Sequence, residues 1–470
     1  MNNKQKAKLH RPIAEAAVFL GALGCCGTGY AAEQATVGEA AAPASIWERD
    51  TLTGDWGGLR AALKDTGTDI TLGYVGEGFD VISGGLRRRS SYEGRFEFSV
   101  DSDLDKAIGW PGAKAHVTIF NIHHGGSNVA ENTGSLADPS NIDGLPTTRL
   151  FTAWLEQSLW NDHFSIRAGQ LAADDEFFTS PTAGGLINGT FGWAGLMSAD
   201  MTNGGPAYPV ATPGIRLKFR PTDRLTALAA AFNGDPAGRH CDDDPQRCNR
   251  HGTKFPLGGG TLWMGELQYG VDQSEGAEGL PGLYKLGAWY SDHGFADQRY
   301  GLTESGASVP VSDPALDSPL NHRGDWGLYG VVDQTIWKSD ARSLSVFLRG
   351  GFSPSNRNLV SYYADGGFGL KGLFASRPDD RLTLGVAYAK ISQDAAAADR
   401  DAVLFNDASY VARSSEIVYE LNYTAQITPW WTLQPDLQYI VRPNGGQNPG
   451  DPTRSMNHAF IVGLRTTIAF

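Results

Sequence analysis

The feature of the sequence that most constrains its fold is a regular alternation of apolar and polar side chains over residues 415–470. Every second residue from Phe460 to Phe470 is apolar or a threonine, while Arg465 lies among the residues between them. Because side chains alternate across a β-strand, this spacing predicts strands with one apolar face and one mixed face. Such strands occur in soluble β-sandwiches and also in membrane β-barrels, whose apolar face meets lipid and whose polar face lines a wet lumen.

The same alternation recurs along the chain and predicts about 16 strands. Their expected positions are residues 69–82, 91–101, 113–123, 148–160, 163–173, 213–220, 224–233, 260–270, 282–295, 324–338, 342–353, 361–376, 380–392, 414–427, 431–442 and 457–470. Long connections alternate with mostly short ones, as at 161–162, 221–223, 339–341, 377–379 and 428–430. Short turns at one end and long loops at the other are typical of outer-membrane barrels. We therefore predict an all-β fold, a transmembrane antiparallel β-barrel over residues 69–470 in the outer membrane of a Gram-negative bacterium.

The N-terminus has the organisation of a secretory signal peptide. A basic segment precedes a mostly apolar run and small residues near Ala31, so we expect residues 1–31 to be removed on export. The chain is acidic, with a net charge of -13, which argues against nucleic acid as a partner. After the signal no run of about 20 apolar residues occurs, so the sequence offers no candidate for a membrane-spanning helix.

Residues 32–68 separate the signal from the first strand. We expect a lead-in followed by a short periplasmic helix, because the stretch LTGDWGGLRAALKDTG begins a helical pattern. Asp55 is its expected N-cap, Leu59 and Leu63 lie on one face, and Gly67 is the expected stop.

Two cysteines remain after the signal, Cys241 and Cys248, in the polar stretch HCDDDPQRCNRH. In an oxidising compartment such a close pair favours a disulfide that closes a loop. A metal site is the alternative, since His240 and His251 flank the pair, but the spacing matches no strong zinc pattern. We predict the disulfide, and no metal or other cofactor.

Several stretches together resemble the carbohydrate-selective porins of the OprB type, from about Leu52 to Phe470. The matching stretches are LTGDWGGLRAAL, DLDKAIGWPGA, FTAWLEQSLWNDHFSIRAGQL, FNGDP, YYADGGFGLKGLF and QITPWWTLQPDLQYIVRPNGG. The resemblance implies a 16-stranded outer-membrane barrel that passes small sugars passively, and a C-terminal Phe470 that the barrel-assembly machinery reads. The loop between Cys241 and Cys248 departs from what we associate with the family.

Strand phase identifies the side chains expected to face the lumen. A sugar offers hydroxyls and an apolar ring face, so planar cations, carboxylates and flat aromatic rings suit its recognition. The charged residues on the lumen phase are Glu93, Arg95, Glu97, Glu156, Arg167, Arg216, Lys218, Arg349 and Arg465, with Glu77 a weaker candidate. The same rule directs Phe151 outward.

The longest connection, residues 174–212, begins with three acidic residues. By analogy with general porins, we expect this loop to fold inward as a constriction whose acidic start faces the wall arginines. The predicted constriction set is Glu93, Arg95, Glu156, Arg167, Asp175, Glu176, Trp193, Arg216 and Lys218.

Alternatives to a sugar channel follow from the same barrel. A general or acidic-solute porin is the second candidate, and it would require a net basic constriction. A barrel enzyme is the third, but no Gly-x-Ser-x-Gly motif accompanies His123, His124 and Ser127. Outer-membrane lipid and lipopolysaccharide are expected partners. The arginine run 87–89 could contact lipopolysaccharide or lie at the pore mouth, but the sequence favours a solvated loop. The oligomeric state is not encoded in any pattern that we recognise.

Overall fold

The computed structural model describes residues 45–470 apart from residues 240, 242, 274–277, 340 and 406–408. The predicted signal peptide and most of the lead-in lie outside the described residues. Among the described residues, no helix is long and apolar enough to cross a membrane.

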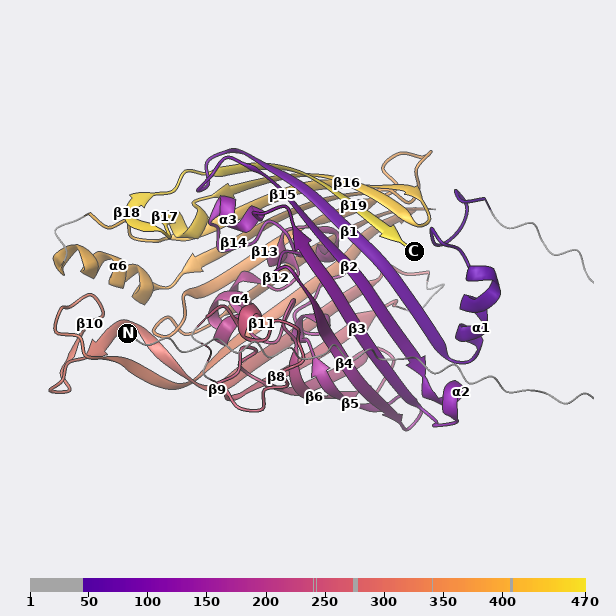
Figure 1. Ribbon diagram of the computed structural model, residues 1–470, viewed down its shortest axis with the longest axis horizontal. Helices are drawn as coiled ribbons and strands as arrows, with labels where there is room; N and C mark the ends of the chain where they lie inside the picture. Colours follow the sequence, from indigo (N-terminus) through magenta and orange to yellow (C-terminus); the bar gives the residue numbers. More distant parts are fainter. Residues whose placement is uncertain (1–44, 240, 242, 274–277, 340, 406–408) are drawn as a thin grey trace, which may run out of the picture. The chain divides into compact units, whose positions relative to one another are not determined.

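One antiparallel sheet closes on itself to form the barrel in Figure 1. It has 17 strands in the described part of the chain; the short β10, Ser308–Pro310, is a side branch, and the other 16 form the wall. The wall strands are β1 Thr68–Ser83, β2 Ser90–Asp103, β3 Ala113–His124, β4 Thr147–Leu159, β5 Phe164–Leu171, β6 Thr212–Phe219, β7 Leu225–Asn233, β8 Thr261–Val271, β9 Gly282–Leu302, β11 Ser318–Ser339, β12 Arg342–Phe352, β13 Val360–Lys371, β14 Arg381–Ile391, β15 Ser415–Thr428, β16 Trp431–Val441 and β19 Ala459–Ala469.

The barrel is closed by β1, which pairs with β2 on one side and with β19 on the other. In this register Glu77 lies opposite Arg465, so the predicted first and last strands meet through two lumen-phase charges. The alternation of the sequence has the predicted consequence: Leu464 is half exposed on the outer face, whereas Ile461 of the same strand is fully buried inside. The predicted 16-stranded barrel is confirmed.

Strand ends differ from the prediction in two places. β9 and β11 continue beyond the predicted residues 295 and 324, because they remain paired with each other outside the barrel proper and also carry β10. β13 ends at Lys371 and not at residue 376, since Gly372 adopts a φ of 70° and starts the turn to β14.

The long connections contain secondary structure of their own. The helices of the described chain are α1 Leu59–Asp65, α2 Leu104–Ile108, α3 Val129–Thr133, α4 Gly195–Asp200, α5 Pro245–Cys248 and α6 Gln393–Phe405, with 3₁₀ turns Trp56–Gly58, Ala173–Asp175, Ala183–Gly185, Gly189–Phe191, Thr202–Gly204 and Pro443–Gly446. A small hairpin pairs β17 Gln447–Asn448 with β18 Asp451–Ser455. In Figure 1, α1 and α2 lie at one end of the barrel, and α6, β10, β17 and β18 lie at the other.

The predicted short N-terminal helix is present as α1, but Asp55 is not its N-cap. Gly58, with a φ of 96°, precedes the first helical residue, and the Asp55 side chain instead accepts a hydrogen bond from the Ala61 N–H at 2.9 Å. Arg60 of α1 donates to the carbonyl of Phe470 at 2.7 Å, and the Leu52 N–H donates to the Ala469 carbonyl at 2.8 Å. The segment that contains LTGDWGGLR therefore holds the end of the last strand.

Candidate functional site

Residues 172–211, the connection between β5 and β6, fold into the barrel. Phe177, Phe178, Phe191 and Leu196 are fully buried there, and they pack in the main apolar cluster with side chains of the wall. The predicted inward fold of the longest loop is therefore observed, and the barrel is partly filled by its own chain.

Carboxylates of the wall hold this loop by its backbone. Glu420 of β15 accepts hydrogen bonds from the N–H groups of Ile187 at 2.6 Å and Asn188 at 2.9 Å. Glu266 of β8 accepts from the Phe178 N–H at 2.8 Å. Backbone N–H groups that leave water need acceptors, and ionised carboxylates are strong ones. These buried charges therefore act as anchors for the loop.

Arg349 of β12 anchors the same loop through its carbonyl groups. Its guanidinium donates to the carbonyls of Phe178 at 2.9 Å and Thr190 at 3.0 Å, and it pairs with Asp365 of β13. Both charged side chains are buried, so this predicted lumen residue has no access to a solute.

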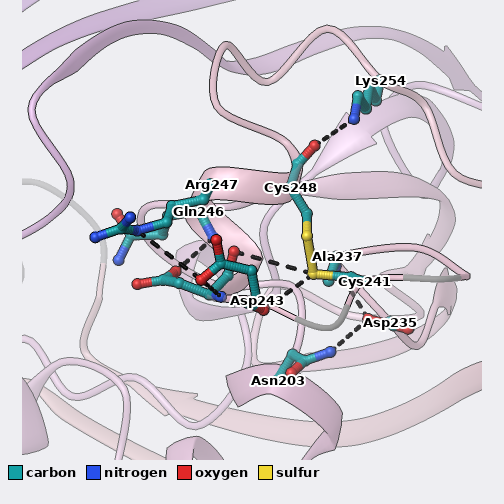
Figure 2. The surroundings of a disulfide bond; sticks show 10 residues. Asn203, Asp235, Ala237, Cys241, Asp243, Gln246, Arg247, Cys248 and Lys254 are labelled. Carbon is teal, nitrogen blue, oxygen red and sulfur yellow. Dashed lines mark hydrogen bonds and ion pairs between the residues drawn. A yellow bond between two sulfur atoms is a disulfide. The ribbon is translucent and has the colours of Figure 1, made fainter.

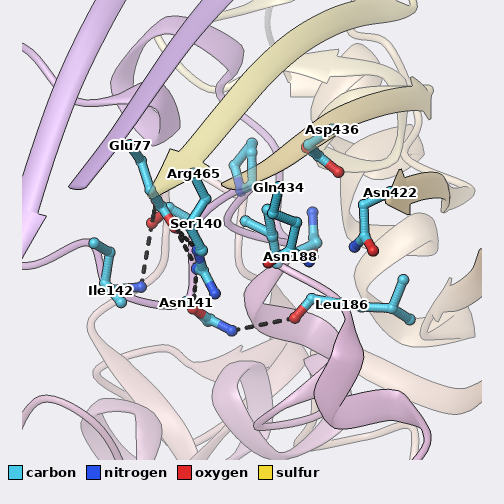
Figure 3. A network of polar contacts seen from close by, with 12 residues as sticks. Glu77, Ser140, Asn141, Ile142, Leu186, Asn188, Asn422, Gln434, Asp436 and Arg465 are labelled. Carbon is cyan, nitrogen blue, oxygen red and sulfur yellow. Dashed lines mark hydrogen bonds and ion pairs between the residues drawn. The ribbon is translucent and has the colours of Figure 1, made fainter. Parts of the chain in front are cut away.

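Residues 125–146, the connection between β3 and β4, form a second inward segment. Figure 3 shows it from close by: Ser140 donates to Glu77 of β1 at 2.6 Å, and Arg465 of β19 pairs with Glu77 and donates to the Asn141 side chain. The Asn141 amide donates to the Leu186 carbonyl at 3.3 Å. The two inward loops are thus joined to each other and to the seam where the barrel closes.

Between these loops and the wall strands β1 to β5 and β19 lies a cavity of about 900 Å³, which we call the lumen chamber. Its wall side includes Val75, Arg95, Glu97, Ser99, Asp101, His116, Thr118, Phe120, Phe151, Thr152, Trp154, Arg167 and Arg465. Its loop side includes Asp138, Ser140, Asn141, Asp143, Asp174, Asp175, Thr190, Trp193, Ser198, Tyr208 and Gln246.

Two guanidinium groups of the chamber wall lie over aromatic rings. Arg95 lies 4.4 Å from the centre of the Phe120 ring and 5.3 Å from that of Tyr208. Arg167 lies 3.8 Å from the centre of the Trp154 ring. Such stacking fixes the plane of the cation while its N–H groups remain available for hydrogen bonds.

A network of ion pairs connects the wall strands β4, β5 and β6 to the start of the loop at residues 172–211. Arg216 of β6 donates to Glu176 of the loop at 2.7 Å and to Glu156 of β4 at 3.1 Å. Arg167 of β5 donates to the same Glu156 at 2.7 Å. The acidic start of the loop therefore meets the wall arginines, as the sequence analysis expects, but Arg216 is fully buried by the contact.

The nine predicted constriction residues fall into three groups. Arg95, Arg167, Asp175 and Trp193 line the lumen chamber. Asp175, Glu176 and Lys218 line a second cavity of about 400 Å³ near the β6–β7 turn. Glu93, Glu156 and Arg216 are buried; Glu93 lies under α3, where it accepts from the Val129 N–H at 2.6 Å. Most of the residues predicted from the strand phase therefore lie around the two cavities. The strand phase does not distinguish the buried residues, which hold the loops, from those that line a cavity.

Sequence reasoning misses several chamber residues because it considers mainly charges. Trp154 and His116 lie on the lumen phase, and their rings stack with centres 4.9 Å apart. The prediction that Phe151 points outward is wrong: it lines the chamber, because it is the extra residue of a β-bulge in β4, where Thr152 pairs with Thr118 and Leu150 with Ile119. A search for aromatic rings on the lumen phase would have found Trp154.

The lumen chamber is acidic. Its lining contains six carboxylates and only three arginines. Burial raises the pKa of the Asp174 carboxyl to about 6, although the N–H of Tyr208 donates to it and opposes the shift. Burial, followed by the charge of Asp143, raises the pKa of Asp138 well above its usual range. The net basic constriction that an acidic-solute porin requires is therefore not found among the described residues of the chamber.

Cys241 and Cys248 form a disulfide, whose surroundings are drawn in Figure 2. Their Cα atoms are 6.0 Å apart, and Cys248 is the last residue of α5. With their sulfur atoms bonded to each other, neither cysteine is free to bind a metal. Among the described residues, no group of three or more His, Cys, Asp or Glu side chains could hold a metal ion.

A closed 16-stranded barrel with an apolar outer face and a charged lumen narrowed by an inward loop defines an outer-membrane porin. The profile of the family described as "Carbohydrate-selective porin, OprB family" matches residues 87–470. The chain belongs to this family, so it is a sugar-selective outer-membrane channel and not an enzyme.

Individual relatives agree with the family. The chain is 27% identical over 492 aligned residues to Porin B of Pseudomonas aeruginosa, covering 99% of this chain and 100% of that protein. A high-pH structure of OprB from Pseudomonas putida superposes with a TM-score of 0.79 at 24% identity, covering 91% of this chain and 100% of that one. A low-pH structure of the same protein gives 0.53 at 20% identity, covering 90% and 99%. At these identities the structures support the fold alone.

Proposed function

We propose that this channel passes small neutral sugars, glucose-like mono- to disaccharides, through the lumen chamber by passive diffusion. The observation that supports this most directly is the pairing of stacked guanidinium groups with nearby carboxylates at the chamber wall. Arg95 lies over Phe120 and Arg167 over Trp154, while Glu97 lies 3.3 Å from Arg95. Planar donors, carboxylate acceptors and flat rings match the hydroxyls and the apolar face of a pyranose.

The proposed roles differ among the predicted residues. Arg95, Arg167 and Asp175 contact the sugar, with Trp193 on the opposite loop side of the chamber. Glu156, Glu176 and Arg216 position Arg167 and the start of the loop, and Glu93 supports α3. Lys218 meets the sugar after the chamber, in the second cavity. Weak contacts suffice, because a permeant must leave as readily as it enters.

An acidic solute is a weaker candidate for the permeant. The chamber lining has six carboxyl groups against three arginines, so it offers no net basic ring that would attract an anion. A neutral sugar needs no such ring, and the same groups can exchange hydrogen bonds with it.

Conductance and solute block in a planar bilayer test the proposal. We expect discrete current steps that glucose reduces and that an amino acid of similar size leaves unchanged. Arg167→Ala should weaken the glucose block, whereas Arg323→Ala, an exposed position on the outer part of β11, should not. Steps that respond equally to both solutes would contradict sugar selectivity.

Two partner assignments extend the proposal. We propose that the exposed arginine run 87–89, on the turn between β1 and β2, contacts lipopolysaccharide; it is absent from the described lining of the chamber. We also propose that residues 1–31 are removed on export.

Finally, we propose that the barrel-assembly machinery reads Phe470. Loss of outer-membrane insertion on deletion of Phe470 would support this role of Phe470.

A further inference from the structure

The disulfide-closed loop reaches the lumen chamber through one side chain. Of the described residues in the connection between β7 and β8, Gln246 alone lines the chamber. It lies on α5, two residues before Cys248, and Figure 2 shows it beside the disulfide. The loop that departs from the family pattern therefore contributes directly to the pore.

Gln246 is held in place through both its side chain and its backbone. Its side-chain oxygen accepts from the Leu145 N–H of the second inward loop at 2.6 Å, and its backbone N–H donates to Asp244 at 2.7 Å. The fit is close, since a Cβ atom at Gly144 would lie 3.2 Å from that oxygen. With its oxygen engaged, Gln246 has its NH₂ group to offer as a hydrogen-bond donor in the chamber.

The chain after α5 is attached to the barrel wall. The carbonyl of Asn249, a buried residue, accepts from the Arg149 guanidinium at 2.9 Å, and the carbonyl of His251 accepts from the Leu150 N–H at 2.9 Å. These contacts fix α5 at its C-terminal side. The chain that enters α5 is tied by the disulfide from Cys241 to the last residue of the helix.

We propose that Gln246 is a specificity-determining residue of the lumen chamber and that the Cys241–Cys248 disulfide is the device that positions it. The inference rests on the proposed passage of neutral sugars: the Gln246 NH₂ group donates to a sugar hydroxyl in the chamber. If the disulfide only stabilised an outer loop, it would have no effect on the chamber. Here it ends on α5, the single helical turn that carries the chamber residue Gln246.

Glucose block in planar bilayers tests the two roles together. The variants are Gln246→Ala, the pair Cys241→Ser with Cys248→Ser, and the three changes combined. Losing one neutral hydrogen bond corresponds to about a fivefold weaker block. We expect this loss in Gln246→Ala, a loss of similar size in the cysteine pair, and no further loss when the changes are combined, because the disulfide acts through Gln246.

Arg247→Ala is the matched control, since Arg247 is on the same helical turn, is exposed and does not line the chamber. Its block by glucose should equal that of the wild type. Reducing the wild-type protein with a phosphine after insertion in the bilayer gives a measurement that does not depend on folding without the disulfide. It should weaken the block as the cysteine pair does.

The outcomes separate this inference from the function on which it rests. A wild-type channel that glucose does not block overturns the proposed function and the inference with it. Block in the wild type that Gln246→Ala leaves unchanged overturns the inference alone. Block that is weakened by Gln246→Ala but not by reduction or by the cysteine pair overturns the positioning role of the disulfide.

Discussion

Two parts of the barrel wall use the same kind of residue for different purposes. On the side formed by β8 to β15, lumen-phase charges such as Glu266, Arg349 and Glu420 are buried against the loop and bind its backbone. On the side formed by β2 to β5, Arg95 and Arg167 remain partly exposed and lie over aromatic rings in the chamber. Strand phase therefore gives the direction of a side chain, whereas the loop that covers it decides whether the side chain anchors the loop or lines the pore.

The physical reason is the cost of removing charge from water. A carboxylate under the loop is tolerated because it receives backbone N–H donors, and its removal orphans those donors. A charge that faces the chamber keeps water around it, so its replacement affects solutes more than stability. Substitutions on the two walls test this contrast.

Arg349→Ala should have the largest effect on stability. The change leaves Asp365 as a buried charge without its cation and removes this donor from three loop carbonyls, those of Phe178, Thr190 and Gly192. Breaking a buried pair in this way costs about 3–5 kcal/mol of unfolding free energy, measured by urea unfolding of the refolded barrel. Arg323→Ala, on an exposed part of β11, should change it by less than about 0.5 kcal/mol. Equal losses of unfolding free energy in the two variants would show that Arg349 does not anchor the loop.

The same substitution on the two walls gives a matched pair. Glu420→Gln weakens charge-assisted bonds to two loop N–H groups, so the unfolding free energy should fall by about 1–2 kcal/mol and the open conductance should rise as the loop loosens. Glu97→Gln removes only a partly exposed ion pair with Arg95, so stability should change by less than about 1 kcal/mol. If Glu420→Gln and Glu97→Gln destabilise the protein equally, the two sides of the barrel wall do not differ in the way proposed.

Arg95→Ala should act on the sugar more than on the fold. Loss of its hydrogen bonds is expected to weaken glucose block by about fivefold, the factor that corresponds to about 1 kcal/mol. Arg95→Lys keeps the charge but loses the planar group over Phe120, so it should restore only part of the block. Full recovery with lysine would show that charge alone matters at this position.

The smallest effect concerns pH. Burial raises the pKa of Asp174 to about 6, and burial followed by the charge of Asp174 raises the pKa of Asp175 to about 7, so both carboxyls gain protons as pH falls and the chamber loses negative charge. Cation preference, measured as the reversal potential in a KCl gradient, should therefore decline between about pH 7 and 5, above the usual range of an aspartate. Asp174→Asn should remove the part of the decline that Asp174 causes, and Glu97→Gln should retain it.

The sign of the linked stability effect is opposite to that of an ordinary ion-paired aspartate. The folded protein holds the Asp174 proton more tightly than the unfolded chain, whose aspartates titrate near 3.9. The contribution to stability is therefore full below that value and is lost as pH rises through about 6. Asp174→Asn should make the unfolding free energy less dependent on pH in this window.

The barrel could be predicted from the sequence alone, because each strand must place apolar side chains toward lipid and polar ones toward water, and that requirement is local and has a period of two. The inward direction of Arg95, Arg167 and Arg216, and the disulfide between two closely spaced cysteines, could be predicted as well. Which inward charges face the solute depends on contacts between segments that are far apart in the chain. Arg216 is a buried bridge and Arg95 a chamber residue because the loop at residues 172–211 covers one and not the other. Wall residues such as Arg349 and Glu420 hold that loop in place, and contacts at such sequence separation leave no periodic signal in the sequence.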